Sequence, residues 1–327
     1  MAHDPGLSND TCIFMEAIPG DGGNQDPNGV WWLSPDIRLT GPVSGPDNAD
    51  AGQINPVQVK FHRKPAGSNC QFPGDEGITV ELWVANPSLV MSPHLPGSAT
   101  RVGFLRSPLP PEGGTGTQPI DWDIPAVLPP DDPQSPGHKC LIARCYPDSG
   151  VPSGTSFFVP GDQHVAQHNL VIVTATGRGL KFKVNTLNPG RIVAPPPFIA
   201  KVKVRAVLDL RPIEFVGRTV TKRLQSQPGF THLRTTPLPG GFRFDLMGLQ
   251  SSNVVDHSHP GLAVPLQPRA IPSFEAQIGL ESRHVTPLTF LADMTGVQTG
   301  EACIFHLIQT SVSGTAEGGL TLVVLKV

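Results

Sequence analysis

The residues whose spacing most clearly suggests chemistry lie in one acidic loop near the start of the chain. Three side chains with oxygen ligands alternate along residues 24–28 and Gly29 closes the loop, a spacing by which a tight turn can direct three ligands at one Ca²⁺. The bidentate carboxylate of a complete calcium loop is absent because Pro35 stands at its position. An ordinary turn rich in Asn and Asp is the alternative. The residues predicted to bind calcium are Asp21, Asn24, Asp26, Asn28 and Asp36.

Two pairs of histidines could contribute to a zinc site that has a distant third ligand. His257 and His259 share one side of an extended segment, whereas His164 and His168 would meet only on a helix, which the neighbouring sequence does not favour. Histidines on surface loops are the preferred interpretation of both pairs. His306 lies in an apolar run and is predicted to be a hydrogen-bonded histidine of the core or of a sheet face.

The cysteines include no C-x-x-C pair. Cys140 and Cys145 lie five positions apart in one strand-like run. This odd spacing places them on opposite faces and makes them poor partners for a disulfide. Buried free thiols are favoured over a disulfide that joins Cys12 or Cys70 to a distant partner.

The composition favours many short strands joined by long loops. Among 327 residues, 35 are glycine and 37 are proline, while charged residues make up only 16%, which disfavours both a helical protein and a charge-rich disordered one. The formal net charge of −3 provides no basic surface for nucleic acid. We therefore predict no nucleic-acid partner. No apolar stretch is long enough to span a bilayer, so we also predict no membrane span.

Alternation of apolar and polar residues predicts β-strands along most of the chain. Their spacing, with turn residues between them, predicts an all-β protein made of two tandem antiparallel β-sandwiches. We place the first domain at residues 1–178, with a long insertion at about 86–139, and the second at 179–327. No segment shows a persuasive helical period. The predicted strands are 11–17, 37–39, 57–62, 78–84, 99–105, 140–145, 169–174, 180–185, 199–207, 242–246, 274–280, 288–292, 303–309 and 320–327, with the last two joined as a hairpin.

Several short motifs follow one another through the first half of the chain. They are an acidic glycine loop, Trp31-Trp32-x-Ser34-Pro35-Asp36-Ile37, Asn55-Pro56-Val57-x-Val59, Val80-x-Leu82-Trp83, His138-Lys139-Cys140-Leu141-Ile142-Ala143-Arg144 and Gln167-His168-Asn169-Leu170. This order resembles a family of bacterial immunoglobulin-like β-sandwich domains with a Trp-x-Ser-Pro-Asp-Ile opening. The resemblance implies an adhesion or cell-surface module and brings no catalytic residues. The chain departs from the family at Lys60-Phe61-His62 and by its insertion after Trp83.

The strongest functional indication concerns assembly. The C-terminal run is apolar, β-branched and almost uncharged, so it must pair inside its own sandwich or against another subunit. Two arms rich in proline and glycine, residues 1–10 and 86–136, could lie across a neighbouring subunit. We therefore predict a non-catalytic, immunoglobulin-like structural protein that self-assembles into a bacterial surface or extracellular array or filament by strand pairing and arm exchange. The residues predicted to make these contacts are Trp31, Trp32, Trp122, Leu320, Leu322 and Val324.

Two other functions remain open. A carbohydrate-binding or other ligand-binding module could stack exposed aromatics such as Trp31 or Trp122 on sugar rings, which makes a polysaccharide the alternative partner. A hydrolase could use a metal, or a thiol such as Cys145 or Cys303 with a distant histidine such as His257, although no catalytic motif is present. Because the first residues lack the basic start and apolar core of a secretory signal, the cytoplasm is the alternative to the predicted extracellular or cell-surface location.

Overall fold

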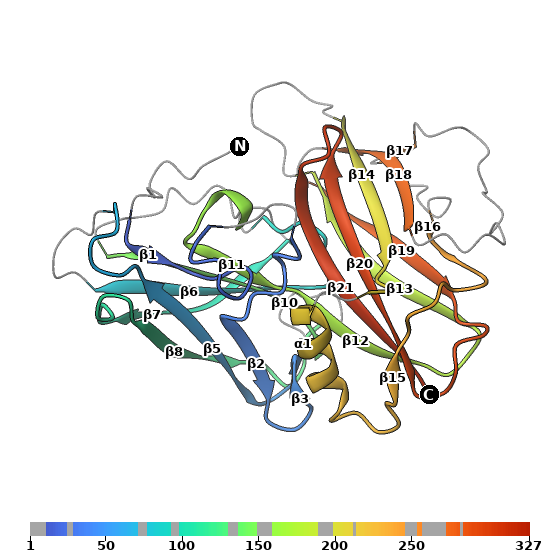
Figure 1. Cartoon of the computed structure of the whole chain (residues 1–327), viewed down its shortest axis with the longest axis horizontal. Helices are drawn as coiled ribbons and strands as arrows, with labels where there is room; N and C mark the ends of the chain where they lie inside the picture. The colour runs from blue at the N-terminus through green and yellow to red at the C-terminus, as the bar shows by residue number, and fades with distance from the viewer. Residues whose placement is uncertain are drawn as a thin grey trace. The chain divides into compact units, whose positions relative to one another are not determined.

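The chain forms two compact units in which strands dominate (Figure 1). Unit 1 comprises Met1–Asn86 and Met91–Asn169, and unit 2 comprises Pro87–Val90 and Leu170–Val327. The computed structural model of the protein describes residues 11–24, 29–70, 77–92, 98–129, 137–148, 159–188, 199–211, 214–245, 254–256, 273–281 and 284–327.

The first sheet of unit 1 is built around β5 (Ile54–Arg63), which pairs antiparallel with β1, β2 and β8. Strand β2 also pairs with β3. Strand β5 alternates, so that Val57, Val59 and Phe61 are buried while the residues between them face outward. The bounds of its partners are Ile13–Phe14 for β1, Ile37–Gly41 for β2, Gly45–Pro46 for β3 and Thr115–Asp123 for β8.

The second sheet of unit 1 has the antiparallel order β11-β10-β6-β7. Both sheets contribute to one hydrophobic core, in which Phe61 and Trp122 of the first sheet share a cluster with Leu82 and Leu141 of the second. Unit 1 is therefore a β-sandwich. The remaining bounds are Ile78–Ala85 for β6, Thr100–Ser107 for β7, Cys140–Pro147 for β10, Val165–His168 for β11, Asn48–Ala49 and Gly137–His138 for the short pair β4 and β9, and Val159–Gly161 for the 3-10 turn η1.

The segment predicted as a long insertion, 86–139, contributes an edge strand to each sheet. Strand β7 matches the one strand predicted there, whereas β8 was not predicted from the sequence. Trp122 of β8 is buried in the core, and Gly116 lets the ring of Phe61 approach, because a Cβ at Gly116 would lie 2.3 Å from Cζ of Phe61. Gly116 and Pro119 interrupt the alternation by which a strand is predicted, because glycine and proline are both unfavourable within regular strands.

Unit 2 contains a large sheet of order β12-β21-β20-β14-β18-β17, with β15 beside β20, and a smaller sheet of order β13-β19-β16. The ring of Phe305 in β20 lies 5.0 Å from that of Phe290 in β19 and 5.3 Å from that of Phe242 in β16, measured between centroids. The two sheets therefore pack face to face as a second β-sandwich. The bounds are Leu170–Ala175 for β12, Gly179–Leu187 for β13, Ile199–Leu208 for β14, His232–Leu233 for β15, Phe242–Asp245 for β16, Val254–Asp256 for β17, Ser273–Glu281 for β18, Val285–Asp293 for β19, Glu301–Ser311 for β20 and Ala316–Lys326 for β21.

The all-β prediction is confirmed, and unit 2 adds two parallel strand pairs and one helix to it. Strand β12 runs parallel to β21, and β15 runs parallel to β20. The helix α1 (Glu214–Leu224) corrects the prediction that no segment is helical, since Val216, Val220 and Leu224 are buried at a spacing of four residues and form one apolar stripe. In the part of the chain that the structure describes, no helix has the length and apolar character needed to cross a bilayer.

The two units divide between Asn169 and Leu170. Strand β12 belongs to unit 2 because it pairs with β21, whereas the sequence-based division places residues 170–178 in the first domain. The predicted hairpin at the end of the chain is confirmed, since β20 and β21 are antiparallel neighbours. Strand β21 therefore has a hydrogen-bonded neighbour on each side.

Candidate functional site

Strand β7 carries a large exposed aromatic side chain at the edge of unit 1. Phe104 is 60% exposed. The guanidinium carbon of Arg101 lies 5.4 Å from the ring centroid of Phe104 and 5.8 Å from that of Trp83, which is a cation–π arrangement. Aromatic and arginine side chains are enriched where proteins bind one another. Strand β7 therefore has the composition of an interaction surface.

A buried ion network holds Arg101 in place. Oε1 of Glu81 accepts a hydrogen bond from Nη1 of Arg101 at 3.0 Å, and Oε2 accepts from Nε and Nη2 of Arg144 at 3.1 and 2.6 Å. The side chains of Glu81 and Arg144 are each 5% exposed. Burial, followed by the charge of Glu81, raises the pKa of Tyr146 to about 12, so this phenol stays neutral beside the network. The charges of Glu81 and Arg144 are thus paired and shielded from water, while Arg101 reaches the surface.

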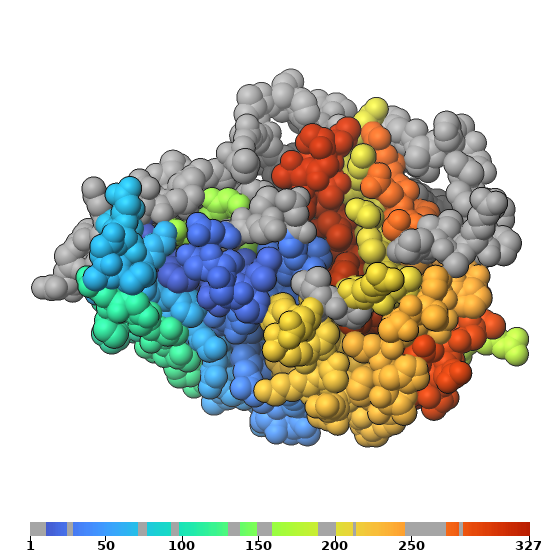
Figure 2. Space-filling view, in the orientation of Figure 1, coloured from blue at the N-terminus to red at the C-terminus, as the bar shows by residue number. Residues whose placement is uncertain are grey.

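Strands β7 and β8 lie at the same edge of unit 1 but in different sheets (Figure 1), and Figure 2 shows this segment in green at the surface. Among the described strands, β7 pairs only with β6 and β8 only with β5. A Cβ at Gly103 would lie 2.5 Å from Cγ2 of Ile120, and Nε2 of Gln118 donates to Oγ of Ser107 at 2.7 Å. The approach of Gly103 to Ile120 defines which residues of the two strands are level. The two contacts together show that the strands run in opposite directions, because the residue numbers rise along β7 and fall along β8.

The two strands carry charges of opposite sign. Arg101 and Arg106 of β7 are exposed, as are Asp121 and Asp123 of β8. Charges at an edge can protect it against unwanted pairing, but opposite charges on two edges also favour pairing between those edges. We call the surface formed by β7 and β8 together the β7–β8 edge.

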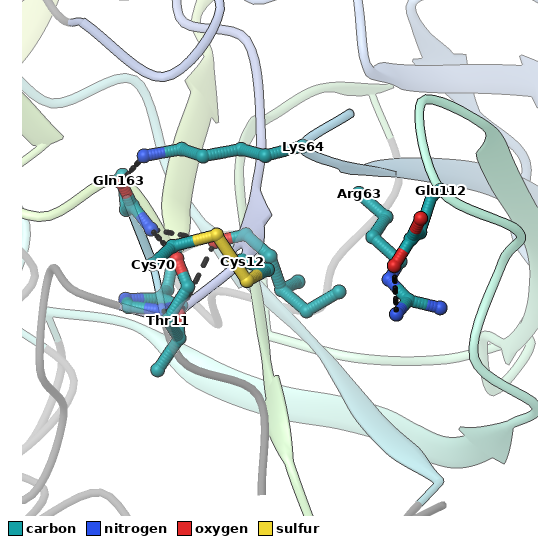
Figure 3. The surroundings of a disulfide bond; sticks show 9 residues. Thr11, Cys12, Arg63, Lys64, Cys70, Glu112 and Gln163 are labelled. Carbon is teal, nitrogen blue, oxygen red and sulfur yellow. Dashed lines mark hydrogen bonds and ion pairs between the residues drawn. A yellow bond between two sulfur atoms is a disulfide. The ribbon is translucent and has the colours of Figure 1, made fainter. Parts of the chain in front are cut away.

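Cys12 and Cys70 form a disulfide (Figure 3), which corrects the prediction of free thiols at these positions. Nζ of Lys64 donates to Oε1 of Gln163 at 3.0 Å, and Nε2 of Gln163 donates to the carbonyl oxygen of Thr11 at 2.7 Å. These bonds tie the start of β1 to the segment before β11. The two cysteines are 58 residues apart, and no local pattern in the sequence links them.

Among the predicted calcium ligands, Asp21 stabilises a turn. Its Oδ2 accepts the N–H groups of residues 17 and 18, and its Oδ1 accepts that of Gly23, each at 2.9 Å. A carboxylate that accepts backbone N–H groups in this way is typical of an ordinary Asx turn, which is the alternative to a calcium loop. Asn24 continues this turn, since its N–H donates to the carbonyl oxygen of Asp21 at 2.9 Å. Asp26 and Asn28 lie outside the described residues, so the calcium loop stays a prediction.

The residues predicted to make intermolecular contacts are core residues. Trp31, Trp32 and Trp122 are 1%, 3% and 1% exposed, and the first two pack edge to face with their ring centroids 5.5 Å apart. The expectation that Trp31 or Trp122 is exposed for stacking on a sugar is therefore wrong. The side chains predicted on the C-terminal strand are fully buried, and β21 is paired with a strand of unit 2 on each side; they are Leu320, Leu322 and Val324.

Three histidines each connect a carboxylate to a hydroxyl group. The three groups are Asp36–His62–Thr115, Asp162–His164–Thr11 and Asp209–His306–Thr321. The same order of groups activates the nucleophile of serine hydrolases. His164 is 0% exposed and His306 is 7% exposed, so a substrate has no direct access to those two imidazoles, whereas the side chain of His62 is 18% exposed. The prediction that His306 is a hydrogen-bonded core histidine is confirmed.

The two predicted zinc pairs have different outcomes. His164 and His168 face different partners, since Nδ1 of His168 lies 3.0 Å from the carbonyl oxygen of Ser34 and its Nε2 lies 3.3 Å from Oδ1 of Asp47. The pair does not converge, as expected for residues that lie on and beside a strand. Both side chains are buried, at 0% and 5% exposed, which corrects the interpretation of this pair as histidines on a surface loop. His257 and His259 lie outside the described residues.

The three remaining thiols are buried and form no disulfide, as predicted, and they are Cys140, Cys145 and Cys303. Burial, followed by the charges of Asp162 and Asp36, raises the pKa of Cys145 well above its usual value. Burial also raises the pKa of Cys303 to about 12, against the opposing charge of Arg234. Since the thiolate is the reactive form, these environments disfavour the thiol-hydrolase alternative.

We expect native protein at pH 8 to resist alkylation by iodoacetamide, because all three thiols are buried and the pKa values of Cys145 and Cys303 are raised. Unfolding without reductant should expose three thiols per chain, and unfolding with reductant should expose all five. Mass spectrometry of the labelled protein counts them. If Cys145 or Cys303 were alkylated as fast in the native protein as in the unfolded protein, the thiol would not be shielded from solvent, and this prediction would be wrong.

Comparisons with known proteins leave the function open. No protein-family description matches the chain, and no curated protein matches it. Among solved structures, the chain is similar to the collagen adhesin from S. aureus, with 9% identity over 88% of this chain and 93% of that chain and a TM-score of 0.21. It is also similar to a structure of manganese lipoxygenase of Gaeumannomyces graminis with part of a zonadhesin of Komagataella pastoris, with 11% identity, coverage of 89% and 92%, and a TM-score of 0.16. At such TM-scores neither similarity bears on function.

Proposed function

We propose that this chain is a non-catalytic structural protein whose copies associate through the β7–β8 edge. The observation that carries the proposal is a pair of strand edges, one basic and one acidic, with the exposed ring of Phe104 among their charges. Strand addition at an open edge supplies backbone hydrogen bonds as well as side-chain contacts. A second copy of the chain presents to each edge the edge of opposite charge.

Two-fold symmetry limits this association to a closed dimer, in which both edges of each copy are paired. Because β7 and β8 run in opposite directions at one edge, a two-fold axis parallel to them places β7 of one copy antiparallel to β8 of the other, twice. Each sheet of one copy then continues into a sheet of the other. The outward side chains of the paired strands fall on the same face, so their charges can meet.

The same axis predicts which residues face each other, because it leaves every residue at its own level along the strands. The close approach of Gly103 to Ile120 therefore sets the register between copies. Opposite charges across paired strands contribute about 0.2–1 kcal/mol each. The predicted neighbours are Arg101 with Asp121 and Asp123, Phe104 with Pro119, and Arg106 with Thr117.

Pro119 limits the strength of this pairing. It removes one backbone donor from β8, and proline is one of the devices by which edges are protected against pairing. The competing outcome is a protein whose charged edges keep it monomeric. The array or filament expected from the sequence would need a further contact, since the β7–β8 pairing closes on itself.

An extracellular or cell-surface location is part of the proposal. The disulfide between Cys12 and Cys70 supports it, because disulfides persist in oxidising compartments and are rare in the cytosol.

We expect sedimentation of the purified protein in a dilution series to give twice the mass of one chain at high concentration. Phe104→Ser should raise the dissociation constant of the dimer at least about 10-fold, because truncating an aromatic residue at the centre of an interface costs on the order of 2 kcal/mol. Val43→Ser is the matched control, since Val43 is 81% exposed in the turn between β2 and β3. It should leave the dimer unchanged.

The mass of a single chain at every concentration would overturn the proposal. So would a dimer that Phe104→Ser and Val43→Ser affect equally.

A further inference from the structure

We infer that Glu16, Asp36 and His62 form a binding site for one divalent transition-metal cation, with Zn²⁺ as the best match. Each residue offers one ligand atom, and these three atoms lie within 4.8 Å of one another. The inference concerns unit 1 alone and does not depend on the association of copies.

Adjacent strands bring the three residues together. His62 is in β5, opposite Phe14 of β1, and Glu16 lies just beyond that strand. Asp36 immediately precedes β2, which pairs with β5 through Ile37 and Val59. The ligands are therefore attached to the ordered sheet of unit 1, which is the kind of support that a preorganised site requires.

Asp36 provides the observation that points to a missing partner. The residue is 1% exposed. Its Oδ2 accepts the N–H of Glu16 at 2.7 Å and lies 3.0 Å from Nε2 of His62. Its Oδ1 is buried without a hydrogen-bond partner among the described residues. A buried carboxylate oxygen without a partner is costly, and a cation beside it would remove this cost.

The imidazole of His62 is oriented for binding through Nε2. Its Nδ1 lies 3.0 Å from Oγ1 of Thr115, and the ring stacks on Phe14 with centroids 5.1 Å apart. A hydrogen bond from Nδ1 to an oxygen fixes the tautomer that leaves the Nε2 lone pair free for a metal. The side chain of His62 is 18% exposed, which gives an ion a path from solvent.

The local charge favours a cation. The carboxylates of Asp36 and Glu16 each bring an oxygen atom within 4.8 Å of the ligand nitrogen of His62. The same two carboxylates would neutralise a divalent ion.

The donor set indicates the class of metal. One imidazole nitrogen with two carboxylates suits Zn²⁺ and its neighbours among the transition metals. Calcium is disfavoured here, because Ca²⁺ takes oxygen ligands almost entirely. The site therefore differs from the predicted calcium loop, with which it shares Asp36.

The test is a titration of chelator-treated full-length protein with Co²⁺, whose visible absorption reports coordination by protein ligands, followed by displacement with Zn²⁺. We expect one Co²⁺ per chain, displaced by one Zn²⁺. Glu16→Gln, at a half-buried position that tolerates the change, should weaken binding at least about 10-fold, and Thr115→Val should do so about 10-fold through the orientation of His62. His62→Gln should abolish it. Circular dichroism checks the fold of each variant.

Asp209→Asn is the matched control, because Asp209 faces His306 in the same manner in unit 2, and it should bind Co²⁺ as the wild type does. The inference is overturned if the wild type binds no Co²⁺, and equally if folded Glu16→Gln and His62→Gln variants bind it as tightly as the wild type. Loss of Co²⁺ binding in Asp209→Asn would place the metal at Asp209 and His306 in unit 2, and this result would also overturn the inference.

Discussion

Replacing Cys12 and Cys70 together by serine is expected to lower the free energy of unfolding of unit 1 by about 4 kcal/mol. The disulfide links residues 58 positions apart, and a cross-link over a loop of that length removes much of the conformational entropy of the unfolded chain. It fastens the segment before β1 to the loop after β5. Denaturant titration followed by tryptophan fluorescence measures the change for unit 1 alone, because all four tryptophans belong to that unit.

Reductant provides the control for this prediction. It should bring the wild type to the stability of the double serine variant and leave that variant unchanged. Equal stability of the wild type in oxidising and reducing buffer would show that the cross-link does not stabilise the fold. It would also remove the main support for an oxidising compartment.

Replacing Glu81 by alanine is expected to destabilise unit 1 by about 3–5 kcal/mol. The carboxylate accepts two hydrogen bonds from Arg144, and the variant leaves that arginine buried without its counter-charge. Arg101 would also lose its anchor, so the dimer should weaken together with the fold. Fluorescence-detected denaturation gives the first effect and sedimentation gives the second.

A paired substitution separates lost charge from lost packing. Glu81→Leu with Arg144→Met replaces both buried charges by apolar groups, which in other proteins is often neutral or stabilising. The double variant should recover most of the stability that Glu81→Ala loses. If instead both variants were equally unstable, the ion pair would not be the cause.

Local patterns in the sequence predict most of the strands, because a strand with one buried face alternates. Strand β5 is an example, with Val57, Val59 and Phe61 inward. The same reasoning misses β8, where Gly116 and Pro119 interrupt the pattern. The helix α1 is a different case, since the spacing of its buried valines is visible in the sequence but its flanks are polar.

The candidate sites depend on contacts that no local pattern specifies. Asp36 meets His62 because β2 and β5 pair in one register, and Glu81 meets Arg144 because β6 and β10 do. A change of one residue in either register would turn these side chains to the other face. The expectation that Trp122 is exposed fails for the same reason, because the sequence pattern does not reveal β8, the strand that carries it. The proposed bacterial immunoglobulin-like family stays a prediction from motif order.

Cross-linking between copies tests the proposed pairing most directly. Arg106 and Thr117 are exposed and should face each other across the dimer, at the spacing of about 5 Å between Cβ atoms of opposite residues. An Arg106→Cys protein is mixed with a Thr117→Cys protein and treated with a short bismaleimide, with the native thiols buried. We expect rapid formation of a covalent heterodimer, and only slow random cross-linking when Val43→Cys replaces Arg106→Cys. Equal, slow cross-linking in both mixtures would contradict association through the β7–β8 edge.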